Sequence, residues 1–150
     1  MKKLQIALVI LLSISMLGAG YAISTFVITH SITSEVQVLV RYGRGPIKAY
    51  WDADKVNLVE TIDFGDVIQG DTDYVYFYIF NENETYAASL NWTSNIDTVT
   101  SGKITDSFIP EIRGSDLEAG EFIGVYYQIS VAADTPTQTY TWTLNLGAEV

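Results

Sequence analysis

Residues 26–40 form an alternating pattern that is longer than a strand in a small domain needs to be. Even positions are mainly apolar and odd positions mainly polar, which is typical of a half-buried β-strand. At ~3.3 Å per residue, a single strand of this length spans roughly 50 Å. A compact body formed by the rest of the chain has a radius of gyration near ~14 Å and is about 35 Å across. We therefore expect either a break near Ser34 and Glu35 or a first half that pairs with something outside the domain.

The N-terminal segment, residues 1–22, predicts a secretory signal peptide. Two lysines precede an apolar run, Leu4–Leu17, and the small residues Gly20 and Ala22 have the spacing of a signal-peptidase site. An uncleaved membrane anchor is the alternative, but the run is shorter than the ~20 residues that cross a bilayer. In type IV pilins the cut falls before the apolar stretch, which is kept for assembly. Because the small residues follow the stretch here, a filament of this chain would have to use strands.

The expected mature chain is acidic, with 6 basic and 18 acidic residues and a net charge of -12. Such a surface repels nucleic acid and anionic membranes and favours solubility, so nucleic acid is excluded as a partner. The remaining length of about 128 residues suits one domain with its own core. The sequence contains no cysteine, which excludes disulfides. Asn83 and Asn91 begin N-glycosylation motifs, which agree with export.

After Ala22 the chain has strand composition with turn residues at short intervals, and no segment predicts a helix. Residues 95–102 are expected to form a loop, and Pro110 predicts an edge strand or a break. The spacing predicts strands at Val36–Val40, Ile47–Trp51, Leu58–Phe64, Tyr74–Phe80, Ala87–Trp92, Ile104–Ile112, Phe122–Val131 and Gln138–Leu146. We therefore expect a single all-β domain, an antiparallel β-sandwich of the jelly-roll or immunoglobulin-like type.

The strand Tyr74–Phe80 is the most apolar run of the mature chain. Its odd residues, Val75, Phe77 and Ile79, are expected to face the core, while its even residues form an aromatic outer face. This predicts a central strand. The strand before it, Leu58–Phe64, is expected to end in a turn at Gly65 and Asp66.

Little in the sequence predicts catalysis, and we expect neither an enzyme nor a cofactor. His30 is the only histidine, and it lies in the N-terminal stripe, away from any nucleophile motif. Phosphate-binding and dinucleotide-binding motifs are absent, and a chain with one histidine and no cysteine lacks the usual ligands of zinc. Paired carboxylates of the glycosidase type are the least favoured alternative.

Four aspartates form a candidate calcium site. Asp63, Asp66, Asp71 and Asp73 cluster around two glycine turns and supply the hard oxygen ligands that Ca²⁺ prefers. Their order differs from an EF-hand loop, and solvated turn residues are the simpler interpretation.

The Tyr and Trp side chains admit three interpretations. They are stacking platforms for sugars, contacts with another protein, or a mixture of core residues and exposed strand residues. The residues concerned are Tyr74, Tyr76, Tyr78, Trp92, Tyr126, Tyr127, Tyr140 and Trp142.

Three parts of the chain resemble a known family. Thr61–Asp71 resembles the "I-D-F/W-G" turn segment of many small secreted archaeal β-domains, and Val75–Glu82 resembles the strand end that precedes their next turn. Their closing hairpin resembles the segments Leu117–Glu121, Tyr127–Val131, Asp134–Pro136 and Tyr140–Trp142. With the signal peptide and the stripe, the chain resembles the archaeal bundling-pilus subunits, which are related to the TasA and camelysin biofilm-matrix proteins.

The resemblance implies a jelly-roll-like sandwich whose N-terminal segment inserts into the neighbouring subunit as a donor strand. The donor would be about Ile23–Thr33, presenting Phe26, Ile28 and Ile32, with Ser34 and Glu35 as the linker. The chain then divides into a signal peptide (1–22), a donor strand with linker (23–34) and a sandwich domain (35–150). Main-chain hydrogen bonds complete an open sheet while alternate side chains fill an apolar groove, and this head-to-tail contact propagates a filament.

The expected function is therefore that of a structural subunit of an extracellular pilus or biofilm-matrix filament. Its partners are further copies of itself and, in bundles, neighbouring filaments, and it supports cell adhesion. The alternative is a secreted monomeric module that binds a glycan or a protein through its tyrosine face. A small secreted hydrolase that uses carboxylates is a third and more distant interpretation.

Overall fold

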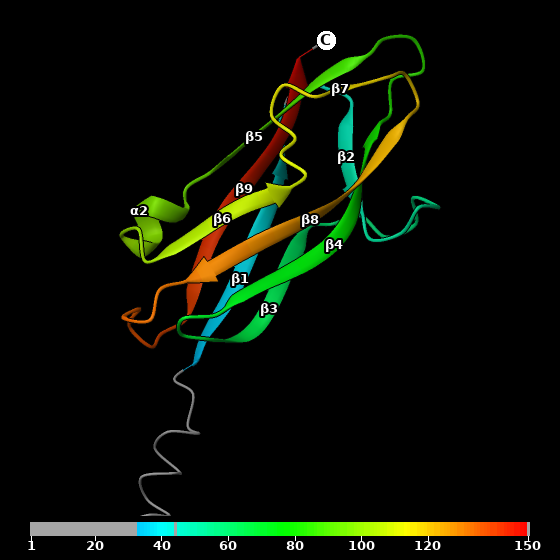
Figure 1. Ribbon diagram of the computed structural model, residues 1–150. Coiled ribbons are helices and arrows are strands. Elements are labelled where there is room, and N and C mark those ends of the chain that lie inside the picture. Colours follow the sequence, from blue (N-terminus) through cyan, green and yellow to red (C-terminus); the bar gives the residue numbers. More distant parts are fainter. Residues whose placement is uncertain (1–32, 44, 150) are drawn as a thin grey trace, which may run out of the picture. The chain divides into compact units, whose positions relative to one another are not determined.

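The computed structural model describes residues 33–43 and 45–149, which form a β-sandwich of two packed sheets (Figure 1). The first sheet has the strand order β3-β1-β9-β5-β7 and the second the order β2-β4-β8-β6. The elements are β1 (Thr33–Tyr42), β2 (Ile47–Tyr50), β3 (Thr61–Ile68), β4 (Thr72–Asn81), β5 (Ala88–Ser94), α2 (Ile96–Thr100), β6 (Ile104–Ile109), β7 (Asp116–Leu117), β8 (Phe122–Val131) and β9 (Tyr140–Glu149). The expected all-β sandwich is confirmed. The expected signal peptide and most of the donor segment lie outside the described residues.

β1 lies inside its sheet and is paired on both sides. It runs antiparallel to β3, from Thr33 opposite Ile68 onward, and parallel to β9, from Val36 opposite Tyr140 onward. The parallel pair is an exception to the antiparallel pairing expected from the sequence. It arises because β1 and β9, which are far apart in the chain, enter the sheet from the same end.

The expected linker is part of β1. Ser34 is buried, pairs with Val67 and donates from its hydroxyl to the carbonyl of Pro136 at 3.3 Å. Glu35 pairs with Asp66 and accepts a hydrogen bond from the Thr139 hydroxyl at 3.1 Å. Polar side chains at these two positions suggested a break, but both find hydrogen-bond partners within the sandwich. The strand therefore continues back to Thr33.

β3 contains a bulge where the sequence predicted a turn. The register with β1 shifts between Val36 and Gln37, which leaves Phe64 without an opposite residue. Gly65 follows at φ 61°, a left-handed conformation that glycine adopts without a Cβ clash. The extra residue changes the phase of the strand, so that Ile62 and Val67, five positions apart, are both buried.

The space between the sheets is filled by large apolar side chains. Trp142 donates from its indole to the Tyr127 hydroxyl at 3.1 Å, and Tyr127 donates to the Asp106 carboxylate at 2.6 Å. Burial raises the pKa of Tyr127 far above its ordinary value, so this hydroxyl stays a neutral donor. The fully buried side chains include Trp142, Tyr127, Phe77, Ile62, Ile79, Ile104, Ile112, Ile129, Leu144, Leu146, Val36 and Val38.

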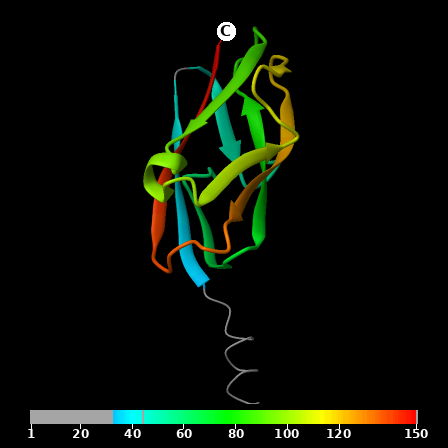
Figure 2. The same ribbon diagram turned by 60° about the vertical axis from the view of Figure 1, so that its left-hand side comes forward.

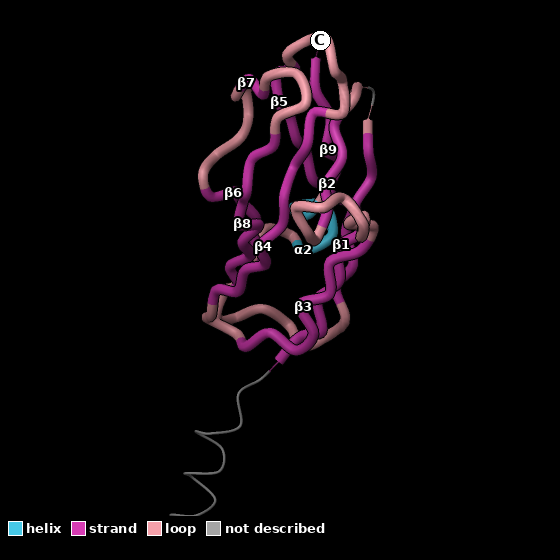
Figure 3. Tube along the Cα trace, turned by 90° about the vertical axis from the view of Figure 1, so that its right-hand side faces the viewer, coloured by secondary structure: helices cyan, strands magenta, loops and turns pink. Residues whose placement is uncertain are grey.

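The alternation predicted for β4 is confirmed. Phe77 and Ile79 are fully buried, and β4 is an inner strand between β2 and β8. Figure 3 shows the two layers side-on, with β4 and β8 in one layer and β1 and β9 in the other. Phe80 belongs to the outer face by parity but is covered, because the Lys55 ammonium lies 4.7 Å from its ring centroid and Phe122 lies beside it.

A short helix replaces part of the expected loop 95–102. α2 begins after Asn95, whose carbonyl accepts from the N–H groups of Thr98 and Val99. Ile96 and Thr100, one turn apart, are its buried residues, and that shared inner face is what the loop interpretation missed. Figure 2 shows α2 beside β5 and β6, the two strands that it connects. Within the described residues, no helix is long and apolar enough to cross a membrane.

β6 ends at Ile109, directly before Pro110, and forms one edge of the second sheet. The edge strand predicted from Pro110 is therefore confirmed. From there the chain crosses to the first sheet, where the two residues of β7 pair with Ala88 and Ser89 of β5. The remainder of β5 has no strand on that side among the described residues.

Asn81 is predicted to be a main polar contributor to stability. It is fully buried, and its amide donates to the carbonyls of Tyr86, Leu117 and Glu118 at 2.8, 3.0 and 3.2 Å. We expect Asn81→Ala to lower the free energy of unfolding by about 2–3 kcal/mol, because buried carbonyls lose their donor. Urea unfolding measures the effect. The exposed Asn145→Ala, whose amide makes only a 3.5 Å contact, should change it by less than about 0.5 kcal/mol, and equal losses in both variants would contradict this role.

Candidate interaction surfaces

The outer face of the β2-β4-β8-β6 sheet carries a cluster of exposed aromatic residues, which we call the aromatic face. Tyr76 lies opposite Tyr126, and Ile109 lies opposite Tyr126 on its other side. Tyr74 and Phe122 extend the cluster along β4 and β8. All five side chains are exposed, so strand alternation gathers them on one surface. The sequence interpretation had included the three tyrosines but had missed Phe122 and Ile109.

Most ring pairs on this surface meet edge to face, whereas Tyr76 and Tyr126 at its centre are 4.9 Å apart and tilted at 55°. The centroids of Tyr74 and Tyr126 are 5.5 Å apart at an interplanar angle of 86°, and those of Tyr76 and Tyr78 are 5.2 Å apart at 81°. Tyr78 and Phe122 continue the pattern at 5.7 Å and 76°. Aromatic pairs favour this arrangement because the positive ring edge meets the negative ring face. The result is a corrugated surface.

Gly124 makes room for the centre of the aromatic face. It lies opposite Tyr78 on β8, and the Tyr76 side chain crosses diagonally above it. A methyl group at Gly124 would overlap the Tyr76 hydroxyl and lie 2.8 Å from its ring carbon Cζ. The absence of a side chain therefore leaves the space above Gly124 that the Tyr76 ring occupies.

A groove separates β5 and β6 on one flank of the sandwich. It encloses about 510 Å³ and is lined by residues of both strands, of α2 and of the segment after β6. Trp92 and Ile96 contribute buried apolar surface to it, whereas Asp97, Asp106 and Glu111 contribute carboxylates. The groove is thus a recess between the edges of the two sheets with mainly polar walls.

Part of the main chain in the groove has no strand partner. The N–H and C=O of Ile104 both engage the Thr100 hydroxyl, at 3.3 and 3.1 Å, on the side of β6 away from β8. Because antiparallel ladders alternate, the main-chain groups of Asp106 and Phe108 face this outer side too. We therefore assign an open edge to β6 between Asp106 and Phe108.

The facing edge of β5 is partly closed by side chains. The main chain of Leu90 bonds to Gly114 and Ser115, and the carbonyl of Trp92 accepts from the Arg113 guanidinium at 3.1 Å. By the same alternation the main chain of Ser94 faces the groove. The open edges thus run along β6 and the last residues of β5.

Trp92 ties the wall of the groove together. Its indole donates to Glu111 at 2.9 Å, and the Arg113 guanidinium lies 4.0 Å from its ring centroid. The hydrogen bond from Trp92 lowers the pKa of the Glu111 carboxyl, with a further contribution from the N–H of Arg113. Glu111 is therefore ionised at neutral pH, and the groove keeps an acidic rim.

β4 has a second open edge. β2 pairs only with Tyr78–Asn81, which leaves Thr72–Phe77 without a neighbour on that side among the described residues. Trp51 lies at the end of β2 and meets Phe77 edge to face at 6.1 Å. This edge has apolar neighbours but forms no recess comparable to the groove between β5 and β6.

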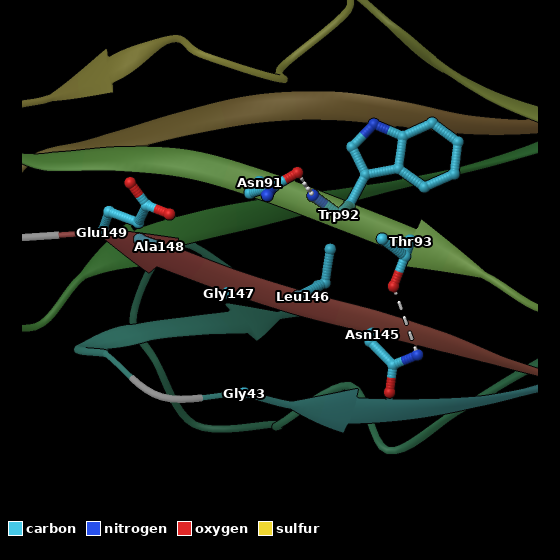
Figure 4. Close-up of a pocket in the computed structure, with 9 residues that line it drawn as sticks. All are labelled: Gly43, Asn91, Trp92, Thr93, Asn145, Leu146, Gly147, Ala148 and Glu149. Carbon is cyan, nitrogen blue, oxygen red and sulfur yellow. Dashed lines mark hydrogen bonds between the residues drawn. The ribbon is translucent and has the colours of Figure 1, made fainter.

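A shallow recess lies on the outer face of the first sheet (Figure 4). It encloses about 180 Å³ beside Gly43 and Gly147. Asn91 and Thr93 of β5 and Asn145 of β9 border it, as Figure 4 shows. These neutral side chains offer hydrogen bonds, and the lining contains one carboxylate, that of Glu149, without a second acid or base beside it.

The four aspartates of the candidate calcium site lie on β3, on β4 and in the turn between them. Asp63 accepts from the N–H of Gly65 at 2.8 Å, and Asp73 from the N–H of Tyr74 at 2.7 Å. Among the residues that the structure describes, no three acidic or histidine side chains gather closely enough to hold a metal ion. Asp63 and Asp73 thus bind local main chain, and the four residues do not form a ligand set.

The two glycosylation candidates differ in their surroundings. Asn83 follows β4 and accepts from the N–H groups of Thr85 and Tyr86 at 2.8 and 3.1 Å, which shapes the turn. Asn91 is exposed on β5, and its side-chain oxygen accepts from the N–H of Trp92 at 2.8 Å. Glycosylation at either position stays a prediction. The donor residues Phe26, Ile28 and Ile32, and also His30, lie outside the described residues.

The eight aromatic residues singled out from the sequence fall into two groups. Trp92, Tyr127, Tyr140 and Trp142 are buried, whereas Tyr74, Tyr76 and Tyr126 belong to the aromatic face and Tyr78 lies half-buried beside them. The division into core and surface was one of the three interpretations, and the exposed group leaves the other two open. The alternation within Phe122–Val131 was the signal that could have placed Phe122 with them.

No protein-family model matches this chain, and no curated protein matches it in sequence. The resemblance to the pilus subunits therefore rests on the sequence motifs alone. The surfaces of the described sandwich are assigned from its own geometry.

The contact between Gly124 and Tyr76 predicts strong coupling between these positions. We expect Gly124→Ala to lower the free energy of unfolding by about 1–2 kcal/mol, because the methyl group displaces the Tyr76 ring. In a Tyr76→Ala background the same change should be neutral or stabilising by up to about 1 kcal/mol, since alanine restricts the unfolded chain more than glycine does. A double-mutant cycle measured by urea unfolding tests this. Additive effects would show that the ring does not rest on Gly124.

Proposed function

We propose that the chain is the structural subunit of an extracellular filament, in which residues 23–32 of one subunit add a β-strand to the next. The observation that carries this proposal is the combination of an alternating apolar segment directly before β1 with open strand edges in the sandwich. Unpaired edges are surfaces on which other strands readily pair, so proteins cover or protect them. Export, adhesion and biofilm formation belong to the same proposal through the signal-peptide pattern and the resemblance to pilus subunits.

The groove between β5 and β6 is the acceptor that we propose. It combines a recess of about 510 Å³ with the open main-chain groups of Asp106 and Phe108 on β6 and of Ser94 on β5. Residues 23–32 contain no acidic side chain, which suits a groove that carries Asp97, Asp106 and Glu111. Main-chain pairing would supply much of the contact, because the mainly polar walls differ from the apolar groove expected from the sequence.

In this proposal assembly requires the donor segment, whereas the fold of the sandwich does not. The segment to delete ends at Ile32, because Thr33 already pairs with Ile68. Ile28 and Thr29 are adjacent, so their side chains lie on opposite faces of an extended strand. A charge introduced at each position in turn gives a matched pair of variants. The apolar face is expected to lie inward in the acceptor.

We expect the chain without residues 1–22 to form filaments visible by negative-stain electron microscopy, and further deletion of residues 23–32 to abolish them. Ile28→Asp should reduce the polymerised fraction in a pelleting assay by at least about tenfold, because it places a charge on the inward face. Thr29→Asp adds the same charge on the outward face and should reduce it far less. Filaments that survive the deletion would refute the donor-strand proposal.

The absence of cysteine allows the acceptor to be located by cross-linking. Thr29→Cys combined with Ser107→Cys on β6 is expected to give a ladder of disulfide-linked multimers when assembled protein is oxidised, since both side chains lie on the outward side of the joint. The matched control combines Thr29→Cys with Thr141→Cys, which is exposed on β9 of the other sheet. A non-reducing gel reads the result. A ladder with Thr72→Cys at the β4 edge instead would refute the groove as acceptor.

A further inference from the structure

The aromatic face is large for a surface that only solvent contacts. Tyr74, Tyr76, Ile109, Phe122 and Tyr126 expose 61%, 42%, 50%, 51% and 43% of their surface. With roughly 200 Å² per large side chain, they offer about 500 Å² of contiguous apolar surface. This is near the upper end of the largest patch on an ordinary monomer, and patches of that size are often interaction sites.

The aromatic face is also free of charge in an acidic chain. The full sequence has 18 acidic and 8 basic residues. The outward positions of β4, β8 and β6 contain none of them. These outward residues are Thr72, Tyr74, Tyr76, Tyr78, Phe80, Phe122, Gly124, Tyr126, Gln128, Ser130, Thr105, Ser107 and Ile109. Two lysines border this surface at its β2 end, where Lys48 pairs with Glu82 at 3.3 Å and the Lys55 ammonium lies 4.7 Å from the Phe80 ring centroid.

This distribution of charge selects the kind of partner. A basic partner would be met by carboxylates, which the outward positions of these strands lack. Two copies of an acidic chain repel each other over most of their surfaces, so they can meet at low electrostatic cost only where charge is absent. The aromatic face fulfils that condition, and the outer face of the other sheet, which carries Glu35, Arg41 and Asp63, does not.

Ring orientation separates a protein partner from a flat saccharide. Sugar rings stack best on aromatic rings that lie parallel to the surface and to one another. Here the rings are inclined to one another, Tyr74 and Tyr126 at 86°, Tyr76 and Tyr78 at 81° and Tyr76 and Tyr126 at 55°, so they do not form one flat platform. Such a corrugated surface can interlock with side chains of a second corrugated surface. Tyrosine also contributes contact area at low conformational cost, and Gly124 leaves the room that the Tyr76 ring occupies in the single chain.

We propose that two copies of this chain associate through the aromatic face as a two-fold symmetric pair, each aromatic face packing against the other. The apolar centre of about 500 Å² and its neutral polar rim, with Gln128 and Ser107, together approach the ~800 Å² per partner of a stable interface. A two-fold contact uses the same surface on both copies and closes on itself. This contact does not depend on residues 23–32, and therefore stands or falls separately from the filament.

The test measures dimerisation of the chain without residues 1–22, carrying Ile28→Asp so that strand exchange does not contribute. Sedimentation equilibrium at increasing protein concentration is expected to show a monomer–dimer equilibrium. Tyr74→Thr combined with Tyr126→Thr should raise its dissociation constant at least about 30-fold, because it removes central aromatic contacts from both copies. Ile109→Thr alone, at the margin of the aromatic face, should give a smaller increase in the dissociation constant. It provides the test if the double variant folds poorly.

Tyr86→Thr is the matched control, because Tyr86 is as exposed as Tyr74, at 61%, but lies outside the aromatic face. It should leave the dissociation constant within about twofold. Raising salt from about 50 mM to about 500 mM should strengthen the dimer, since it screens the repulsion between two acidic copies. A chain that stays monomeric to about 1 mM, or a dimer that the aromatic variants leave unchanged, would overturn the proposal. So would a monomer whose tyrosine fluorescence responds to oligosaccharides, a result that would favour the binding-module alternative instead.

Discussion

The pairing of β1 on both sides is the constraint on which the proposed assembly depends. β3 and β9 occupy its two edges, and its first ladder pair, Thr33 with Ile68, is followed on β3 by the turn to β4. Both edges of β1 are therefore occupied, and a donor strand cannot add to β1 itself. In the proposed filament, residues 23–32 bury their apolar side chains in another subunit.

The two outer faces of the sandwich have different chemistry although the strands alternate in the same way. On the β4 and β8 side the outward positions are aromatic or neutral, whereas the β1 and β9 side presents Thr, Asn, Gln and charged residues. The inner positions are equally apolar in both sheets, so the core does not require this difference. The asymmetry therefore reflects what each outer face contacts outside the domain. The groove between β5 and β6 and the aromatic face then serve different contacts.

Local alternation made most of the sandwich predictable, and non-local pairing made the rest unpredictable. β4 and β8 alternate inward and outward residues along most of their length, with buried Phe80 as an exception in β4, so their faces followed from the sequence. The parallel neighbour of β1 did not, because Tyr140 and Val36 are distant in the chain. The bulge at Phe64 and Gly65 places the buried residues Ile62 and Val67 five positions apart. A rule of simple alternation interprets that spacing as the end of a strand. Ser34 was interpreted as a linker because the acceptor of its hydroxyl, the carbonyl of Pro136, lies 102 positions away in the sequence and cannot be inferred from the local pattern.

The groove and the aromatic face would produce different kinds of assembly from copies of the chain. A strand added at β6 joins subunits head to tail and leaves each product with a free donor and a free acceptor, so it extends without limit. A two-fold contact through the aromatic face uses one surface on each copy and stops at two. The groove lies between the edges of β5 and β6 beside α2, and the aromatic face lies on the broad side of the β2-β4-β8-β6 sheet, so occupying one leaves most of the other accessible. The two surfaces meet at Ser107, which lines the groove and also belongs to the polar rim of the aromatic face, and Ile109 of the aromatic face ends the same strand. Coupling between the two contacts, where it exists, should therefore pass through the C-terminal end of β6.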